Sequence, residues 1–346
     1  MTDDLRPAFH SYRDVDPAAP EGDALNLAWT RDERACLAID LDAALADELR
    51  DELAREPRAL DRYLVRDPYG EATLGPAIAA AFELPAWQAR ITCGAGVVSL
   101  LHALARSTSR DAVRVVGDVY PDFPYWAATS RAPAAGAVWF LERPSLAGDA
   151  FADLGELAAL CDDAARSGAI VIVDESNANY YPPAWSALGL AVARDNLAVL
   201  RGFSKAYGLG ALRLAFCAAS PALTERVRDA VPPLLASSLS LRLGARVLAA
   251  GDVAAPLRAR VHAHKRATLD VLARAGVDAL EPASEHLPYV LSRASRDHLS
   301  ARLEARGVTG KHHPVYTGDR GSVATIYRLS VPLADDRLAR LRKLVG

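Results

Sequence analysis

The sequence predicts an α/β fold in which helices cover both faces of a mostly parallel sheet, followed by a small α+β C-terminal domain. From Arg90 onward, short apolar strands alternate with helical segments. The run 169–173 (AIVIV) is apolar throughout, as expected for a strand buried on both faces. Beyond Pro256 this alternation gives way to one long helical segment and several shorter, mixed elements.

The elements follow from the spacing of apolar residues. In the first part of the chain, helices are predicted at 42–55, 74–82, 97–105, 154–166, 223–235 and 239–250, and strands at 113–116, 137–141, 169–173, 197–200 and 212–218. The C-terminal part is predicted as helices at 258–275, 296–306 and 335–344 and strands at 289–291 and 326–331. Pro7, Pro17 and Pro20 indicate an N-terminal arm rather than a packed element.

These elements predict a division of the chain into domains. Residues 1–35 are expected to form the N-terminal arm and part of the small domain. Residues 36–255 would form the large domain and 256–346 the small C-terminal domain. A chain of 346 residues is long enough for more than one domain.

Composition excludes several classes of protein. Hydrophobic residues make up 51% of the chain and charged residues 24%, the profile of a soluble globular protein. The net charge of -3, without a basic cluster, argues against a nucleic-acid partner. No apolar run has the length of a membrane span, and the acidic N-terminus is unlike a signal peptide. The four cysteines lack metal-ligand spacing, so we expect free thiols, no metal and a cytoplasmic location.

Two polar residues follow apolar strands. Asp174 comes directly after the strand 169–173, and Lys205 follows the apolar run 197–200. Ligands of open α/β sheets bind at the carboxyl edge of the strands, where we expect both side chains. A lysine that loses water there can condense with an aldehyde, and Arg213 could hold a phosphate. The combination indicates a pyridoxal 5'-phosphate (PLP) site with Lys205 as the Schiff-base residue.

Each of these residues has a plainer explanation when it is taken alone. A Ser-Lys pair near an arginine is common on a solvated surface, and an aspartate after a strand can cap the following turn. An aspartate in a PLP site, however, pairs with the protonated ring nitrogen and makes the ring an electron sink. The joint occurrence of Asp174, Lys205 and Arg213 favours that interpretation.

The segment 201–213 (RGFSKAYGLGALR), together with Asp174, resembles the class I and II aminotransferases, which are PLP enzymes of fold type I. Within that family the chain is most similar to the histidinol-phosphate aminotransferase group. The resemblance runs with interruptions from Tyr63 to the C-terminus. It implies PLP as cofactor, a homodimer and an amino-acid substrate. It also implies that Lys205 moves the proton between Cα and C4'.

The resemblance assigns further residues to the cofactor phosphate. Arg213 and Ser204 match phosphate contacts, and Gly94, Ala95 and Gly96 match a loop whose amides hold the phosphate at a helix N-terminus. A tight turn before a helix would also explain the Gly-Ala-Gly sequence. Its place between a strand and an apolar helix is the context that the phosphate role requires.

Two assignments of aromatic residues also follow from the resemblance. Tyr120 matches the aromatic residue that stacks on the pyridine ring, although Phe123 and Tyr125 lie in the same loop and all three could be packing residues. Tyr63, with Tyr69 as the fallback, matches a tyrosine that reaches the cofactor of the neighbouring subunit.

Arg328 matches the arginine that binds the substrate carboxylate, a role that suits its planar fork. An arginine on a surface strand would have the same appearance in sequence.

The chain departs from the family pattern near the 3'-oxygen of the cofactor. The family's Asn-Pro-Thr-Gly turn is 143–148 (RPSLAG) here, without asparagine, and the tyrosine three residues after the aspartate is Asn177. Asn177 could replace one hydrogen bond, with Asn179 or Tyr180 assisting. Two contacts elsewhere also change: Gly202 replaces a phosphate-binding hydroxyl residue, and 25–29 (LNLAW) lacks the family's glutamate.

These features predict a diverged PLP-dependent aminotransferase that acts on an α-amino acid or related amine through a Lys205 Schiff base. The altered 3'-oxygen environment leaves open a non-transaminating PLP enzyme that catalyses elimination, cyclisation, decarboxylation or oxidation. His312 and His313, before Pro314, are expected in a polar loop that could border the substrate, although such histidines are commonly exposed.

Overall fold

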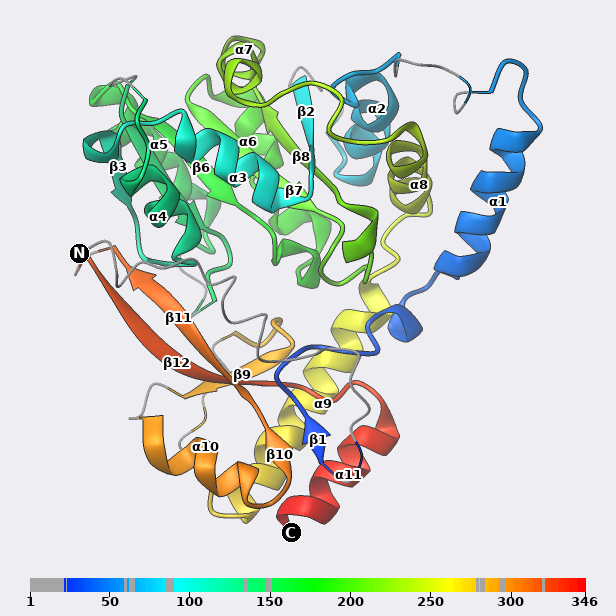
Figure 1. Ribbon diagram of the computed structural model, residues 1–346, viewed down its shortest axis with the longest axis vertical. Coiled ribbons are helices and arrows are strands. Elements are labelled where there is room, and N and C mark those ends of the chain that lie inside the picture. The colour runs from blue at the N-terminus through cyan, green and yellow to red at the C-terminus, as the bar shows by residue number, and fades with distance from the viewer. Residues whose placement is uncertain are drawn as a thin grey trace.

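The computed structural model describes residues 22, 24–58, 61, 66–84, 90–132, 136–146, 148, 151–277, 280, 284–292, 296–318 and 321–346. Tyr63 and most of the expected N-terminal arm lie outside these residues. The described elements form two lobes, each built on its own sheet, and the long helix α9 (Ala255–Arg274) runs from one lobe into the other (Figure 1).

The larger lobe contains a six-stranded sheet with the order β2-β8-β7-β6-β5-β3. Its strands are β2 (Arg90–Ala95), β3 (Val113–Val115), β5 (Val138–Glu142), β6 (Ile170–Asp174), β7 (Leu197–Gly202) and β8 (Leu214–Ala219). The pairs from β3 through β7 are parallel, whereas β8 runs antiparallel to both of its neighbours. The predicted mostly parallel sheet is therefore confirmed, with one reversed strand.

Helices cover both faces of this sheet, because its strands bury side chains on both sides. Val171 and Val173 of β6 pack into one core, while Ile172 between them packs into the other. This alternation follows from the two-residue repeat of a strand. The first face is covered by α2 (Glu71–Ala81), α5 (Leu154–Arg166), α6 (Leu188–Ala193) and α8 (Ser238–Ala249). The second is covered by α3 (Val97–Arg106), α4 (Asp122–Ala128) and α7 (Pro221–Ala230).

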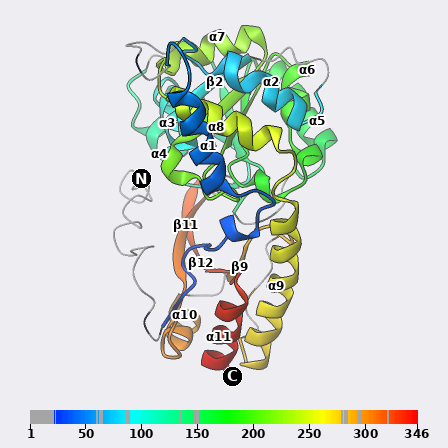
Figure 2. The same cartoon turned by 90° about the vertical axis from the view of Figure 1, so that its right-hand side faces the viewer.

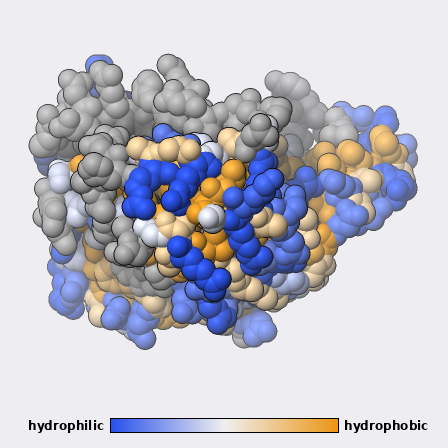
Figure 3. Space-filling model, turned by 90° about the horizontal axis from the view of Figure 1, so that it is seen from below, coloured by the Kyte–Doolittle hydropathy of each residue, from blue (hydrophilic) through white to orange (hydrophobic). Residues whose placement is uncertain are grey.

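The smaller lobe contains a four-stranded sheet with the order β4-β11-β12-β9. Its strands are β4 (Asp118–Val119), β9 (Tyr289–Ser292), β11 (Lys311–Thr317) and β12 (Ser322–Ser330). Because β4 comes from the segment that follows β3, the large lobe contributes one edge strand to this sheet. The helices α10 (Arg296–Glu304) and α11 (Asp335–Val345) lie at the far end of this lobe, and α11 lies beside α9 (Figure 2). Seen from that end, hydrophilic side chains surround a smaller apolar area (Figure 3).

The last part of the expected N-terminal arm is packed, which corrects the prediction of an unpacked arm up to about residue 30. Strand β1 (Leu25–Asn26) pairs with β10 (Val308–Thr309), and Leu25, Leu27 and Ala28 are fully buried. Prolines upstream do not prevent this packing, since they lie before the strand. The remaining helices are α1 (Leu41–Leu53), which stands beside the large lobe in Figure 1, and short 3-10 turns at Arg34–Cys36, Arg110–Ala112, Ala178–Tyr180, Pro183–Trp185 and Gly210–Leu212.

The expected loop around His312 and His313 is wrong, because these residues belong to strand β11, near its start. Positions 311, 313 and 315 of this strand are buried, and two of them carry the polar side chains Lys311 and His313. A search for alternating apolar residues therefore could not detect the strand. Several boundaries also differ: for example, helix α7 ends at Ala230, and β8 begins at Leu214 after a 3-10 turn. No helix in the described ranges is long and apolar enough to cross a bilayer.

Candidate active site

A cavity of about 640 Å³ is lined by residues of both lobes. The large lobe contributes the ends of two neighbouring strands, Glu142 on β5 and Asp174 on β6, and the loop with Lys205 after β7. The small lobe contributes Lys311 and Arg328 from the paired strands β11 and β12. The cavity thus lies at the carboxyl edge of the parallel strands, where open α/β sheets bind ligands.

Asp174 and Lys205 face the same cavity, as the sequence predicts. Asp174 is buried, and its Oδ1 atom accepts a hydrogen bond from the Ser176 backbone at 2.8 Å. Burial raises the pKa of the Asp174 carboxyl, and the charge of Lys205 opposes that effect. Lys205 opens onto the cavity, yet the loss of bulk water around it lowers the pKa of its amine, with Asp174 opposing. Neither charge is fully compensated, so a cation placed against Asp174 would be stabilised.

The loop that carries Lys205 is held from below by Asn179. The Nδ2 atom of Asn179 donates to the carbonyl of Gly202 at 2.8 Å and to that of Lys205 at 3.5 Å. The next residue, Ala206, has a left-handed backbone with φ of 63°, which turns the chain sharply after the lysine. Asn179 therefore does not line the cavity, in contrast to its expected assisting role there, whereas Asn177 and Tyr180 do.

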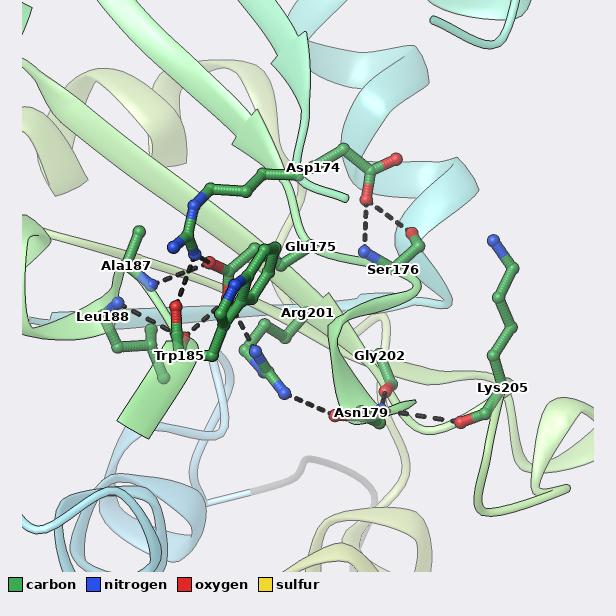
Figure 4. Close-up of polar contacts among 12 residues, drawn as sticks. Asp174, Glu175, Ser176, Asn179, Trp185, Ala187, Leu188, Arg201, Gly202 and Lys205 are labelled. Atoms are coloured by element: carbon green, nitrogen blue, oxygen red, sulfur yellow. Dashed lines mark hydrogen bonds and ion pairs between the residues drawn. The ribbon is translucent and has the colours of Figure 1, made fainter. Parts of the chain in front are cut away.

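Beneath Asp174 lies a buried cluster of charges. Asp174 and Glu175 point to opposite sides of the end of β6 (Figure 4). Glu175 accepts from Arg143 at 2.9 Å and from Arg201 at 2.6 Å, and its side chain has no exposed surface. Arg143 also lies over the ring of Trp185, 3.6 Å from its centroid. Arg143, at the start of the turn where the family has its asparagine, is thus a structural residue of the strand ends.

Two of the expected phosphate residues line the cavity, and the loop with Ala95 and Gly96 lies against one of them. The two are Arg213 and Ser204, and the Nη2 atom of Arg213 donates to the carbonyl of Ala95 at 2.9 Å. Gly96 has φ of 80°, and a Cβ atom there would lie only 2.2 Å from that same Nη2 atom. A side chain at this position would displace the guanidinium. Gly94 and Ala95 are the final residues of β2 and lead into this turn, directly before α3.

Among the aromatic candidates, Tyr120 is the one that lines the cavity. Its ring stacks on His313, with 5.4 Å between centroids. Phe123 instead packs against Phe140 in the core, and Tyr125 does not line the cavity. Tyr69 lies against the guanidinium of Arg228.

Strands β11 and β12 present basic side chains to the cavity. Lys311 and Arg328 are directly opposite in the antiparallel register, which places both side chains on one face. Arg328 donates to the carbonyl of Ala28 at 3.0 Å, and the Lys311 amine lies 4.0 Å from the ring centroid of Trp29. Burial, together with the charge of Arg328, lowers the pKa of Lys311 to about 7. The same surroundings lower the pKa of the buried His313.

Sequence reasoning missed Glu142, Lys311, Trp29 and Glu33, all of which line the cavity. Glu142 was detectable in principle, because it ends a predicted apolar strand as Asp174 does. The packing of the N-terminal segment brings Glu33 to the cavity, where it accepts hydrogen bonds from Tyr180 and from the backbone of Ala206. Such contacts between distant segments leave no local signal in the sequence.

The residues around the cavity fit PLP. Arg213, Ser204 and the N-terminus of α3 could hold a phosphate, and Asp174 could pair with a protonated ring nitrogen. The close approach of Gly96 to Arg213 is a further sign of a site built for an anion. Within the described part of the chain, no group of three His, Cys, Asp or Glu residues could hold a metal ion, and the four cysteines are unpaired.

Comparison with known proteins agrees with this geometry. The sequence profile described as "Aminotransferase class I and II" matches residues 147–320. An aromatic amino acid aminotransferase of Cutibacterium acnes is 27% identical over 141 residues, or 40% of each chain. That of Thermobifida fusca is 29% identical over 227 residues, which cover 58% of this chain and 62% of the relative. These matches therefore span less than two thirds of the relatives' own lengths.

A solved structure shows the same fold. The histidinol-phosphate aminotransferase from Clostridium acetobutylicum superposes with a TM-score of 0.71 at 12% identity, over 92% of this chain and 98% of that one.

Proposed function

The chain belongs to the class I and II aminotransferase family, and from that membership we propose that it is a PLP-dependent aminotransferase acting on an α-amino acid. The observation that supports the proposal best is the meeting of Asp174, Lys205 and Arg213 around one cavity. Each of the three supplies a contact that the cofactor requires: a partner for the ring nitrogen, a reactive amine and a phosphate fork.

The side chains divide the chemistry between them. PLP, when bound, supplies an electron sink for the negative charge that develops at the Cα atom of an amino acid. The lowered pKa of Lys205 favours the uncharged amine, which could take the proton from the Cα atom and deliver it to the C4' position. Asp174 would keep the ring nitrogen protonated. Arg328 would bind the α-carboxylate and so hold the Cα–H bond in one orientation.

We propose an aromatic amino acid as the donor. The cavity wall includes the rings of Trp29, Trp126 and Tyr289 beside the apolar side chains Val98 and Leu101. A wall of this kind would bury an aromatic side chain while Arg328 holds the carboxylate. Two relatives named aromatic amino acid aminotransferases support this choice.

A second candidate is a PLP enzyme that does not transaminate. The observation that favours it is the replacement of both usual donors to the 3'-oxygen. The turn at Arg143 directs that residue into a buried ion cluster, and Asn177 occupies the position of the tyrosine. Weaker hydrogen-bond donation to the 3'-oxygen would change the basicity of the Schiff-base nitrogen. It would thereby change which bond at Cα is weakened.

We also propose a cytoplasmic homodimer. The four unpaired cysteines support a reducing compartment. On α1, Leu53 is 64% exposed and Leu49 is 38% exposed, which leaves apolar surface for a second subunit to cover. Analytical ultracentrifugation of the wild type and of Leu53→Glu tests the assembly. A monomeric wild type would contradict it.

The function is tested first on the purified chain with added PLP. Borohydride reduction followed by peptide mapping should place the cofactor on Lys205, and Lys205→Ala should lose the label. Tyrosine or phenylalanine, supplied without a keto acid, should then yield one equivalent of the corresponding keto acid. Release of ammonia or carbon dioxide instead would favour the second candidate. Absence of any label in the wild type would refute PLP binding.

A further inference from the structure

Glu142 is a buried acid at the cavity to which no role has been assigned so far. It is the last residue of β5, and it is the register partner of Asp174 on β6. Its side chain lines the cavity, although the residue is only 8% exposed. The carboxyl ends of β5 and β6 thus place two acids side by side, on the side of the cavity where the family's asparagine is missing.

The Glu142 carboxyl also fixes a neighbouring loop. Its Oε1 atom accepts a hydrogen bond from the backbone amide of Tyr120 at 2.7 Å. The backbone of Leu146, in the turn after β5, also acts to lower the pKa of this carboxyl. Glu142 therefore connects the end of its own strand to the loop that carries Tyr120, the residue expected to stack on the cofactor ring.

The two acids differ in their surroundings. Burial, reinforced by the charge of Asp174, raises the pKa of Glu142 to about 8, against the opposing effects of the Tyr120 and Leu146 backbones and of Lys205. The pKa of Asp174 is also raised by burial, but the charge of Lys205 and the hydrogen bonds from Ser176 act to lower it. When two neighbouring carboxyls cannot both ionise, the proton stays on the one that is less well compensated. Here that acid is Glu142.

We propose that Glu142 is a further residue of the cofactor site, which holds the Tyr120 loop in place and offers a protonated carboxyl as a hydrogen-bond donor beside Asp174. This proposal rests on the proposed PLP function. A protonated acid differs from a carboxylate in having an O–H group to donate. It would supply a donor on the side of the cavity from which the usual asparagine is absent.

The protonation state can be measured without the cofactor. An infrared difference spectrum of the apoprotein, wild type minus Glu142→Gln, should show a protonated carboxylic acid at pH 6.5 that disappears as the pH rises through about 8. The buried Glu33, whose pKa burial also raises, is the control: Glu33→Gln should remove a different band. A carboxylate band for Glu142 at pH 6.5 would overturn the proposal.

The second measurement is PLP affinity, by spectral titration of apoprotein. Glu142→Gln keeps a neutral donor and an acceptor, so it should weaken PLP binding less than threefold. Glu142→Ala removes both the donor beside Asp174 and the acceptor that holds the Tyr120 loop, so it should weaken PLP binding about 10–100-fold. Equal affinities of Glu142→Ala and wild type would refute the proposal. Failure of the wild type itself to bind PLP would refute the proposed function instead. The infrared test of the Glu142 protonation state does not depend on PLP binding.

Discussion

Removal of Glu175 should destabilise the protein strongly, although the residue does not line the cavity. Its carboxylate accepts from Arg143 and Arg201 and also from the Ala187 backbone at 2.7 Å. The side chains of Glu175 and Arg143 are fully buried, and that of Arg201 is 5% exposed. Glu175→Ala would leave two buried guanidinium groups without their common counter-charge.

The size of the effect follows from that burial. Breaking a single buried ion pair by removal of one partner costs about 3–5 kcal/mol, because the remaining charge is left uncompensated. Since two arginines share this carboxylate, we expect at least the upper part of that range. For a large domain this corresponds to a fall in Tm of about 10–20 °C, at about 2–4 °C per kcal/mol.

Thermal and urea unfolding of the apoprotein provide the assay. The matched control is Glu225→Ala, which removes a surface carboxylate that is 65% exposed and lies 2.6 Å from Arg90. It should change the free energy of unfolding by less than about 1 kcal/mol. In the triple variant Arg143→Met, Glu175→Leu, Arg201→Met, no charge remains unpaired, and stability should recover in part. A loss for Glu175→Ala as small as that of the control would refute this reasoning.

Three further predictions concern the cavity. Gly96→Ala should weaken PLP binding about 10-fold or more, because the new side chain displaces Arg213. The control Gly117→Ala has a similar φ of 72° but open space around it, so it should lower stability without changing PLP affinity. Equal PLP affinities of the two variants would contradict this. Arg328→Lys should raise the KM for the amino donor about 10–100-fold by loss of the bidentate fork, and an unchanged KM would place the carboxylate elsewhere. Lys311 has a pKa lowered in the folded state to about 7 from 10.5, so the free energy of unfolding of the wild type relative to Lys311→Met should rise between pH 7 and 10.5 and be flat below pH 7. Parallel curves for the two proteins in urea titrations across this range would show that Lys311 keeps its ordinary pKa.

The sequence predicted the large lobe well, for a physical reason. Strands such as 169–173 are buried on both faces, so their hydrophobic runs are continuous, and each ends at a polar residue. The strand-end rule then located Asp174 and Lys205 at one edge of the sheet, and the structure brings both to the cavity. Prediction was weaker for β11, where the buried positions Lys311 and His313 are polar because they face the cavity.

The role of Arg143 could not be predicted either. In the sequence it is the first residue of a turn that lacks the expected asparagine. The missing asparagine gives no information about what Arg143 contacts. Its actual partners are Glu175 and Trp185, both more than thirty positions away along the chain. A buried ion cluster depends on the packing of three strand ends against one another, and no local pattern encodes it.

What the sequence determined by itself is the fold class, the family and the place of Lys205 at the carboxyl edge of the sheet. These depend on local periodicity and on residues close together in the chain, such as Ser204, Lys205 and Arg213. The tertiary structure alone decided which distant residues complete the cavity: Glu142 beside Asp174, Tyr120 against His313, and Trp29 against Lys311. The reason is that strand register and lobe packing set these contacts, and both arise from the burial of the whole chain.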